Sequence, residues 1–222
     1  MITTNPRGDP TQCTAEEEGS NLLNNYLLPL IDSGKDVVVF AHSFGATSCS
    51  GAEQGLTKSA RQAQGLKGGL IGFIGLSFGL PQDGHTQLEL LGNAWPDFIK
   101  PDGAGKGLLI FASPGDSLYH DVIDEDLKQH LVRAHLPQAT SVFETPVKEP
   151  LWSDAGLEGR RTYICPTKDA VFPPAIQEMF VKDSGVDWDW NEVPGGHCAF
   201  IAEAEPVASI VCDSIDRFLE KL

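Results

Sequence analysis

Three polar side chains in this sequence have the types and the order that nucleophilic catalysis needs. Ser43 lies in a small-x-Ser-x-Gly pattern at residues 41–45, Asp169 follows Thr167-Lys168, and His197 follows two glycines. In such a set the serine oxygen attacks a carbonyl carbon, and the imidazole takes the serine proton and later passes it to the leaving group. The carboxylate holds the imidazole in the correct tautomer. The pattern therefore indicates acyl transfer, with Ser43 as nucleophile, His197 as base and Asp169 as acid.

The serine motif is expected where a strand turns sharply into a helix. Residues 36–41 are an apolar run rich in β-branched side chains, which predicts a strand buried on both faces. The turn calls for small residues two positions before and after the serine, as Ala41 and Gly45 are. It would place the Ser43 oxygen at the positive end of a helix and let the Phe44 N–H donate to a developing oxyanion. The alternative is a Ser-Gly turn that ends a strand of a Rossmann-type fold.

The other two residues are expected at the same edge of the sheet as Ser43. Asp169 follows a predicted strand at 161–165, and His197 follows one at 187–193. The carboxyl ends of parallel strands meet at one edge, where ligands and catalytic groups gather. The 197 − 169 = 28 residues between acid and base leave room for one helix and one strand.

Strands that alternate with helices predict an α/β fold with a mostly parallel sheet and flanking helices. A second strand is expected at 66–74, and its glycines do not form a dinucleotide-binding loop. Further helices are expected at 15–31, 47–64, 121–135, 173–181 and 205–222. Frequent Pro and Gly and dispersed aromatic residues distinguish residues 78–158, which we interpret as an inserted lid. The predicted division is 1–77 and 159–222 for the core, with the lid between them.

Several side chains near the predicted site are candidates for a substrate pocket. Aromatic residues of the lid could line an apolar pocket, although each could instead pack in a core. His42, within the serine motif, is expected to point away from Ser43, and the histidines of the lid are weaker candidates for the base. The candidate pocket residues are His42, Phe78, Tyr119, Trp152 and Cys198.

Composition excludes several classes of function. The 16 Lys and Arg against 31 Asp and Glu give a formal charge of −15, which disfavours nucleic acid and anionic membranes as partners. No apolar stretch is long enough to span a membrane, and the first residues do not resemble a secretory signal. The five scattered cysteines show neither a disulfide framework nor metal-ligand spacing. We therefore expect a cytoplasmic protein with free thiols that acts on a small molecule without a metal or cofactor.

Taken together, the motifs resemble the α/β-hydrolase superfamily, and most closely the small esterase group of plant methylesterases, hydroxynitrile lyases and their fungal relatives. The matching stretches are residues 34–45, 167–177 and 196–200, and the resemblance spans nearly the whole chain. It implies that Ser43, Asp169 and His197 are nucleophile, acid and base. The lyases of this group carry a lysine directly after the catalytic histidine. Cys198 stands there in this chain, which favours ester or thioester cleavage over cyanohydrin chemistry.

The resemblance is incomplete at the beginning of the chain. The family starts with further strands, one of which ends in a loop that supplies a second oxyanion donor, and this sequence starts after them. The Phe44 N–H is then the one donor that we assign, and the serine strand is expected at an open sheet edge. A shortened sequence, a homodimer that pairs the exposed edges, and a weakly active member are the competing explanations.

The predicted function is a serine hydrolase that cleaves a small, mostly apolar ester, thioester or lactone through an acyl-enzyme. The alternatives are a non-catalytic ligand-binding homologue, and a lyase or cyclase that uses the same triad as acid and base.

Overall fold

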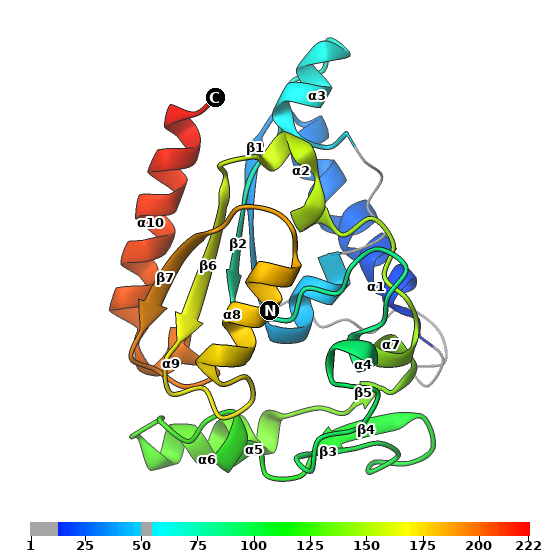
Figure 1. Ribbon diagram of the computed structural model, residues 1–222, viewed down its shortest axis with the longest axis vertical. Helices are drawn as coiled ribbons and strands as arrows, with labels where there is room; N and C mark the ends of the chain where they lie inside the picture. The colour runs from blue at the N-terminus through cyan, green and yellow to red at the C-terminus, as the bar shows by residue number, and fades with distance from the viewer. Residues whose placement is uncertain (1–12, 50–54) are drawn as a thin grey trace.

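The computed structural model describes residues 13–49 and 55–222 of the 222-residue chain. Its main sheet is fully parallel, in the order β1-β2-β6-β7, and a small antiparallel sheet has the order β3-β4-β5 (Figure 1). The main strands are β1 (Asp36–His42), β2 (Gly69–Leu76), β6 (Arg161–Pro166) and β7 (Asp189–Val193). The small strands are β3 (Ile99–Lys100), β4 (Leu108–Phe111) and β5 (Gln138–Ala139). The predicted α/β fold with a mostly parallel sheet is confirmed.

Helices flank both faces of the main sheet. Before and after β1 the chain forms α1 (Ala15–Leu22), the π-helical turn η2 (Leu23–Leu27), α2 (Leu28–Asp32), the 3₁₀ turn η3 (Ser43–Cys49) and α3 (Lys58–Ala63). Between β2 and β6 lie α4 (Gln87–Leu90), α5 (Pro114–Ser117), α6 (Glu125–Ala134), α7 (Ser141–Glu144), η4 (Leu151–Ser153) and η5 (Ala155–Leu157). The last part of the chain contributes α8 (Pro174–Asp183), α9 (Ala199–Ala202) and α10 (Ala204–Glu220).

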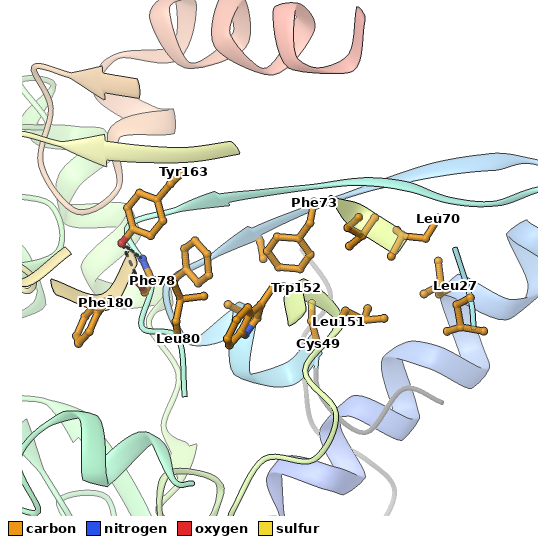
Figure 2. Packing of buried hydrophobic residues seen from close by; sticks show 14 of the residues in the cluster. Leu27, Cys49, Leu70, Phe73, Phe78, Leu80, Leu151, Trp152, Tyr163 and Phe180 are labelled. Carbon is orange, nitrogen blue, oxygen red and sulfur yellow. Dashed lines mark hydrogen bonds between the residues drawn. The ribbon is translucent and has the colours of Figure 1, made fainter. Parts of the chain in front are cut away.

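Two apolar clusters, one on each face of the sheet, hold the helices in place. Successive strand residues point to opposite faces, so Phe73 and Tyr163 belong to one cluster while Ile74 and Ile164 belong to the other. The first cluster packs against η2, α2, η3 and η4 (Figure 2). The second packs against α10, which runs along one flank of the sheet (Figure 1). The C-terminal ends of the strands are therefore fixed from both sides.

The first helix begins where the sequence predicts it. The Thr14 hydroxyl accepts a hydrogen bond from the Glu17 N–H, and the Glu17 carboxylate accepts one from the Thr14 N–H, at 3.1 and 3.0 Å. This reciprocal capping box satisfies two N–H groups that the helix leaves free. The helical stretch continues through η2 and α2 to Asp32, so the expected helix at 15–31 is confirmed.

The serine strand β1 differs from the expectation of burial on both faces. It is the terminal strand of the sheet, and Asp36 and the Phe40 side chain are exposed, the latter at 43%. The prediction of full burial was wrong because only β2 pairs with β1 among the described residues, whereas the expected open edge is present. Pairing of this edge in a homodimer stays a prediction. The helix expected at 47–64 appears as η3 and α3, and residues 50–54 lie outside the described ranges.

The insertion between β2 and β6 lies partly over the site and partly within the core. Figure 1 shows β3, β4, α5 and α6 beyond the carboxyl ends of β6 and β7. The end of the insertion returns to the main core, where Trp152 of η4 belongs to the same apolar cluster as Phe73. The predicted boundaries at 78 and 158 stay a prediction. In the described parts of the chain no helix has the length and apolar character to cross a membrane.

Candidate active site

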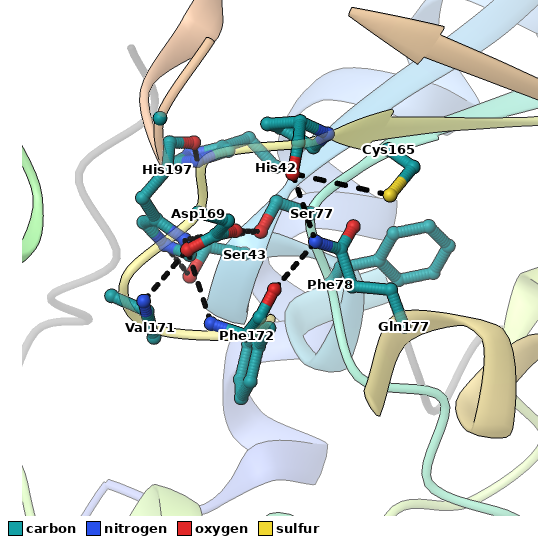
Figure 3. A network of polar contacts seen from close by, with 12 residues as sticks. His42, Ser43, Ser77, Phe78, Cys165, Asp169, Val171, Phe172, Gln177 and His197 are labelled. Atoms are coloured by element: carbon teal, nitrogen blue, oxygen red, sulfur yellow. Dashed lines mark hydrogen bonds and ion pairs between the residues drawn. The ribbon is translucent and has the colours of Figure 1, made fainter. Parts of the chain in front are cut away.

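Ser43, His197 and Asp169 converge at the carboxyl ends of β1, β7 and β6 (Figure 3). The Ser43 Oγ lies 2.8 Å from His197 Nε2. On the opposite side of the ring, His197 Nδ1 lies 3.0 Å from Asp169 Oδ2 and 3.2 Å from Oδ1. A hydroxyl, an imidazole and a carboxylate in this line have the geometry of proton transfer from the serine oxygen.

The turn that carries Ser43 stores backbone strain. Ser43 has φ = +52°, a left-handed conformation that side chains other than glycine rarely adopt. Strain of this kind is held in place by the surrounding structure and gathers at active sites. We expected the tight turn to leave no room for a side chain at Gly45. The structure differs, because a Cβ added to Gly45 meets no heavy atom of the described residues within 4 Å. Ser43 is also the first residue of the 3₁₀ turn η3, which stands in place of the regular helix that we expected.

Asp169 is buried and held as an anion by several donors. The backbone N–H groups of Val171 and Phe172 donate to its Oδ1 at 2.7 and 3.0 Å, and the Ser77 hydroxyl donates to Oδ2. Burial works against the anion, but hydrogen bonding to His197, the charge of His197 and the donors Ser77 and Phe172 outweigh it, so the pKa of Asp169 is lowered. The carboxylate therefore stays ionised beside the imidazole at neutral pH.

Ser77 is a member of this cluster that the sequence reasoning missed. It follows the last residue of β2, and its Oγ lies 3.0 Å from His197 Nδ1. Ser77, His197 and Asp169 thus also form a triad-like arrangement, but on the Nδ1 side of the ring. Its position just after a buried strand was the available signal, since Ser43 and Asp169 were found by that rule. No motif surrounds Ser77 to distinguish it from an ordinary turn residue.

The loop that carries His197 is fixed from two directions. His42 Nε2 lies 2.9 Å from the backbone oxygen of His197, and the two imidazole rings are 4.9 Å apart. Burial and the nearby His197 lower the pKa of His42 to about 3, so His42 is neutral and donates to that oxygen. From the insertion, Asp121 Oδ2 accepts a hydrogen bond from the Gly196 N–H at 2.6 Å. A Cβ at Gly196 would lie 2.5 Å from His120 Cε1, which explains the glycine before His197.

Two of the predicted pocket residues lie in the core instead. Phe78 and Trp152 are 0% and 1% exposed, and both belong to the first apolar cluster, where Phe78 stacks on Tyr163 (Figure 2). Their burial favours the alternative of packing in a core for these two rings, and their contact with a substrate stays a prediction.

The three remaining pocket candidates lie close to the His197 loop or within it. His42 supports that loop, Cys198 is buried and Tyr119 is half-buried. Burial raises the pKa of the Cys198 thiol to about 12. Burial also raises the pKa of the Tyr119 hydroxyl to about 12, with a smaller contribution from the nearby Cys198. Both groups are therefore protonated at neutral pH. Their contact with a substrate stays a prediction.

Two apolar rings belong to residues next to the candidate triad. The Phe44 ring stacks on Phe143 of α7 with centroids 4.5 Å apart, and the Phe172 ring lies edge-on to His197 at 5.9 Å. The Phe44 side chain is thus anchored to the insertion while its N–H directly follows Ser43, and its role as oxyanion donor stays a prediction. Among the described residues no group of three or more His, Cys, Asp or Glu side chains is placed to hold a metal ion.

Comparison with known proteins supplies the family of this architecture. The model of the alpha/beta hydrolase family matches residues 6–210. A pyrethroid hydrolase from Sphingobium faniae JZ-2 superimposes with a TM-score of 0.63 at 19% identity, over 96% of this chain and 82% of that one. A polyneuridine aldehyde esterase superimposes with a TM-score of 0.62 at 17% identity, over 90% of this chain and 79% of that one. A methylesterase from Arabidopsis superimposes with a TM-score of 0.63 at 16% identity, over 91% of this chain and 78% of that one. Comparison with curated protein sequences gives no match.

Proposed function

Because this chain belongs to the alpha/beta hydrolase family, we propose that it is a serine-dependent carboxylic ester hydrolase. The observation that carries the proposal is the alignment of Ser43 Oγ, 2.8 Å from His197 Nε2, with Asp169 on the opposite nitrogen. The positive φ of Ser43 adds to it, because this strained turn holds the hydroxyl at the end of its strand.

The contacts support a two-step mechanism. Ser43 Oγ attacks the ester carbonyl while His197 Nε2 takes its proton, and Asp169 stabilises the imidazolium that forms. The Phe44 N–H donates to the oxyanion. The imidazolium then protonates the departing alcohol, and the acyl group remains on Ser43. Water attacks this acyl-enzyme with His197 again as base, and the acid is released.

Apolar surroundings support a small, mostly apolar ester, thioester or lactone as substrate. The rings of Phe44 and Phe172 lie beside the reacting residues, and the imidazole of His42 contacts Phe200 with centroids 4.9 Å apart. Such walls favour apolar acyl or alcohol groups over charged ones. The solved structures with this fold include enzymes named as a pyrethroid hydrolase, a polyneuridine aldehyde esterase and a methylesterase, which agrees with an ester substrate.

Burial supports Ser43 over Ser77 as nucleophile. Ser77 is 0% exposed, and it approaches the imidazole from the same side as Asp169. A nucleophile there would have no access to substrate and would compete with the carboxylate for Nδ1. Ser43 is partly exposed, and its hydroxyl is the only hydrogen-bond partner of His197 Nε2 among the described residues.

A fluorophosphonate probe tests the proposal, because it forms a stable adduct with an activated serine. We expect the adduct on Ser43, identified by peptide mass spectrometry, and its loss in Ser43→Ala. In His197→Ala we expect the rate of p-nitrophenyl acetate hydrolysis to fall about 10⁴–10⁶-fold, as when a triad is broken.

The matched control is Ser214→Ala, which removes a buried hydroxyl of α10 on the sheet face that carries the second apolar cluster. This hydroxyl accepts a hydrogen bond from the Thr162 hydroxyl at 2.9 Å. The variant should label and turn over like the parent. An adduct on Ser77, or turnover that Ser43→Ala leaves intact, would contradict the assignment. Ligand binding without turnover in the parent would indicate the non-catalytic alternative.

A further inference from the structure

The backbone around Ser77 is held on both sides, so the direction of its side chain is fixed. The Ser77 N–H donates to the Ile164 oxygen at 3.1 Å. The next residue, Phe78, donates through its N–H to the Tyr163 hydroxyl at 3.2 Å and accepts from that hydroxyl at 2.8 Å. Ser77 has φ = +44°, a second left-handed serine at a strand end. Strand β6 thus maintains a strained turn that aims the Ser77 hydroxyl at the site (Figure 3).

The contacts of this hydroxyl determine where the protons are. Ser77 Oγ contacts Asp169 Oδ2 and lies 3.0 Å from His197 Nδ1. A hydroxyl has one proton, and an ionised carboxylate can only accept, so the Ser77 proton points to Asp169. The Ser77 oxygen then presents lone pairs to Nδ1, which must carry a proton of its own. That tautomer leaves Nε2 free to accept the Ser43 proton.

We propose that Ser77 is a positioning residue that fixes the Asp169 carboxylate and the tautomer of His197 for attack by Ser43. The effect of Ser77 on attack by Ser43 rests on the proposed function. Its effect on the Asp169 carboxylate and on the tautomer of His197 rests on the hydrogen bonds alone. Val171 and Phe172 donate to Oδ1 and Ser77 donates to Oδ2, so removal of the hydroxyl leaves His197 Nδ1 as the one donor to Oδ2 among the described residues.

The Ser77 hydroxyl also moderates the basicity of the carboxylate. A donor on Oδ2 draws negative charge from the oxygen that faces the imidazole. Without that donor Asp169 stabilises the imidazolium more strongly, and the imidazole must be neutral to act as base. The acid limb of the kcat/KM profile therefore moves to higher pH when the hydroxyl is lost. A residue that merely packs beside the site would not move this limb.

The test uses Ser77→Ala and Ser77→Gly in the full chain, with p-nitrophenyl acetate as substrate. Glycine adopts a positive φ without strain, so agreement between the two variants separates loss of the hydroxyl from backbone strain. We expect kcat to fall roughly tenfold, as for loss of one hydrogen bond to a charged group, with KM unchanged. We also expect the acid limb to shift upward in both variants.

A second readout does not depend on turnover. The Nδ1 proton of His197 gives a downfield proton NMR signal, and we expect it to move further downfield in both Ser77 variants as its bond to the more basic carboxylate strengthens. The control Ser214→Ala, which removes a buried, hydrogen-bonded hydroxyl away from the site, should shift neither the signal nor the acid limb.

An acid limb and a Nδ1 signal that stay at their parental positions in both Ser77 variants would overturn the inference. Should the parent protein show no ester turnover, the proposed function fails and the NMR signal alone decides the role of Ser77.

Discussion

At Asp169, burial and hydrogen bonding act in opposite directions on one carboxylate. Removal from water favours the neutral acid, whereas His197, Ser77 and the Phe172 N–H favour the anion. The donors outweigh burial, so the folded protein holds this carboxylate ionised at pH values where the unfolded chain has begun to protonate it. The same arrangement that stabilises an imidazolium in catalysis therefore contributes to stability.

This linkage predicts how stability depends on pH. The unfolded chain binds a proton at Asp169 more readily than the folded protein, so the contribution is present above the ordinary Asp pKa of about 3.9 and is lost as pH falls through the lowered folded value. We expect Asp169→Asn to lose less unfolding free energy than the parent between about pH 5 and pH 2. Urea unfolding followed by circular dichroism at several pH values measures this.

The control for that series is Asp126→Asn, which removes an exposed carboxylate from the first turn of α6. It should keep the parental pH dependence. An Asp169→Asn variant with the same acid slope as the parent would show that the donors around this carboxylate do not favour its anion in the folded state.

The candidate triad was predictable because three separate constraints apply to each of its residues. Ser43, Asp169 and His197 all follow predicted strands of the parallel sheet, occur in a fixed order and have short motifs around them. Ser77 satisfies only the first constraint, and Asp121 satisfies none, since its contact with Gly196 depends on how the insertion folds back over the site. Residues that act through a partner distant in sequence leave no local pattern.

At the scale of the element, β2 is built around glycines that allow large rings to lie against it. A Cβ on Gly72 would lie 2.0 Å from Phe218 Cδ2, and one on Gly75 would lie 1.7 Å from Phe78 Cε1. Both rings are buried, one on each face of the sheet. The glycine-rich sequence that could suggest a nucleotide loop thus serves close packing of aromatic rings on the central strands.

This packing predicts a large effect from one methyl group. Gly72→Ala forces the Phe218 ring of α10 away from the sheet, and overpacking of this kind costs about 1–3 kcal/mol of unfolding free energy. Gly45→Ala is the matched control, because no described heavy atom lies within 4 Å of the added methyl group and φ is not positive. Thermal or urea unfolding of both variants decides the point. Equal stability of the two would mean that α10 adjusts freely.

For two other elements, the sequence predicts the secondary structure but not the burial of the side chains. The helix expected at 121–135 is present as α6, yet none of the residues of α6 is buried, and Leu127 is 40% exposed. The apolar run of β1 correctly predicts a strand, but its position at the end of the sheet leaves Phe40 exposed. Periodicity identifies a face that can be buried, and only the tertiary arrangement determines what covers it.

At the scale of the whole molecule, the dominant feature is the excess of acidic side chains. With 31 Asp and Glu against 16 Lys and Arg, 31 − 16 = 15 carboxylates lack a cationic counterpart however the chain folds. Described ion pairs such as Lys58–Asp36 and Lys148–Glu16 lie at the surface, where a single pair contributes little. Folding concentrates the remaining negative charge, and the resulting repulsion disfavours the compact state.

The final prediction follows from this repulsion. Salt shortens the range of interaction between exposed charges from about 30 Å at 0.01 M to about 8 Å at 0.15 M. We therefore expect the Tm at pH 7.5 to rise by a few degrees when NaCl increases from 0.01 to 0.15 M, since about 1 kcal/mol shifts Tm by about 2–4 °C in a domain of this size. Near pH 4.6, the isoelectric point of the sequence, net repulsion is small and the same salt step should change Tm little. A Tm at pH 7.5 that stays constant or falls with salt would show that favourable ion pairs outweigh the repulsion among the unpaired carboxylates.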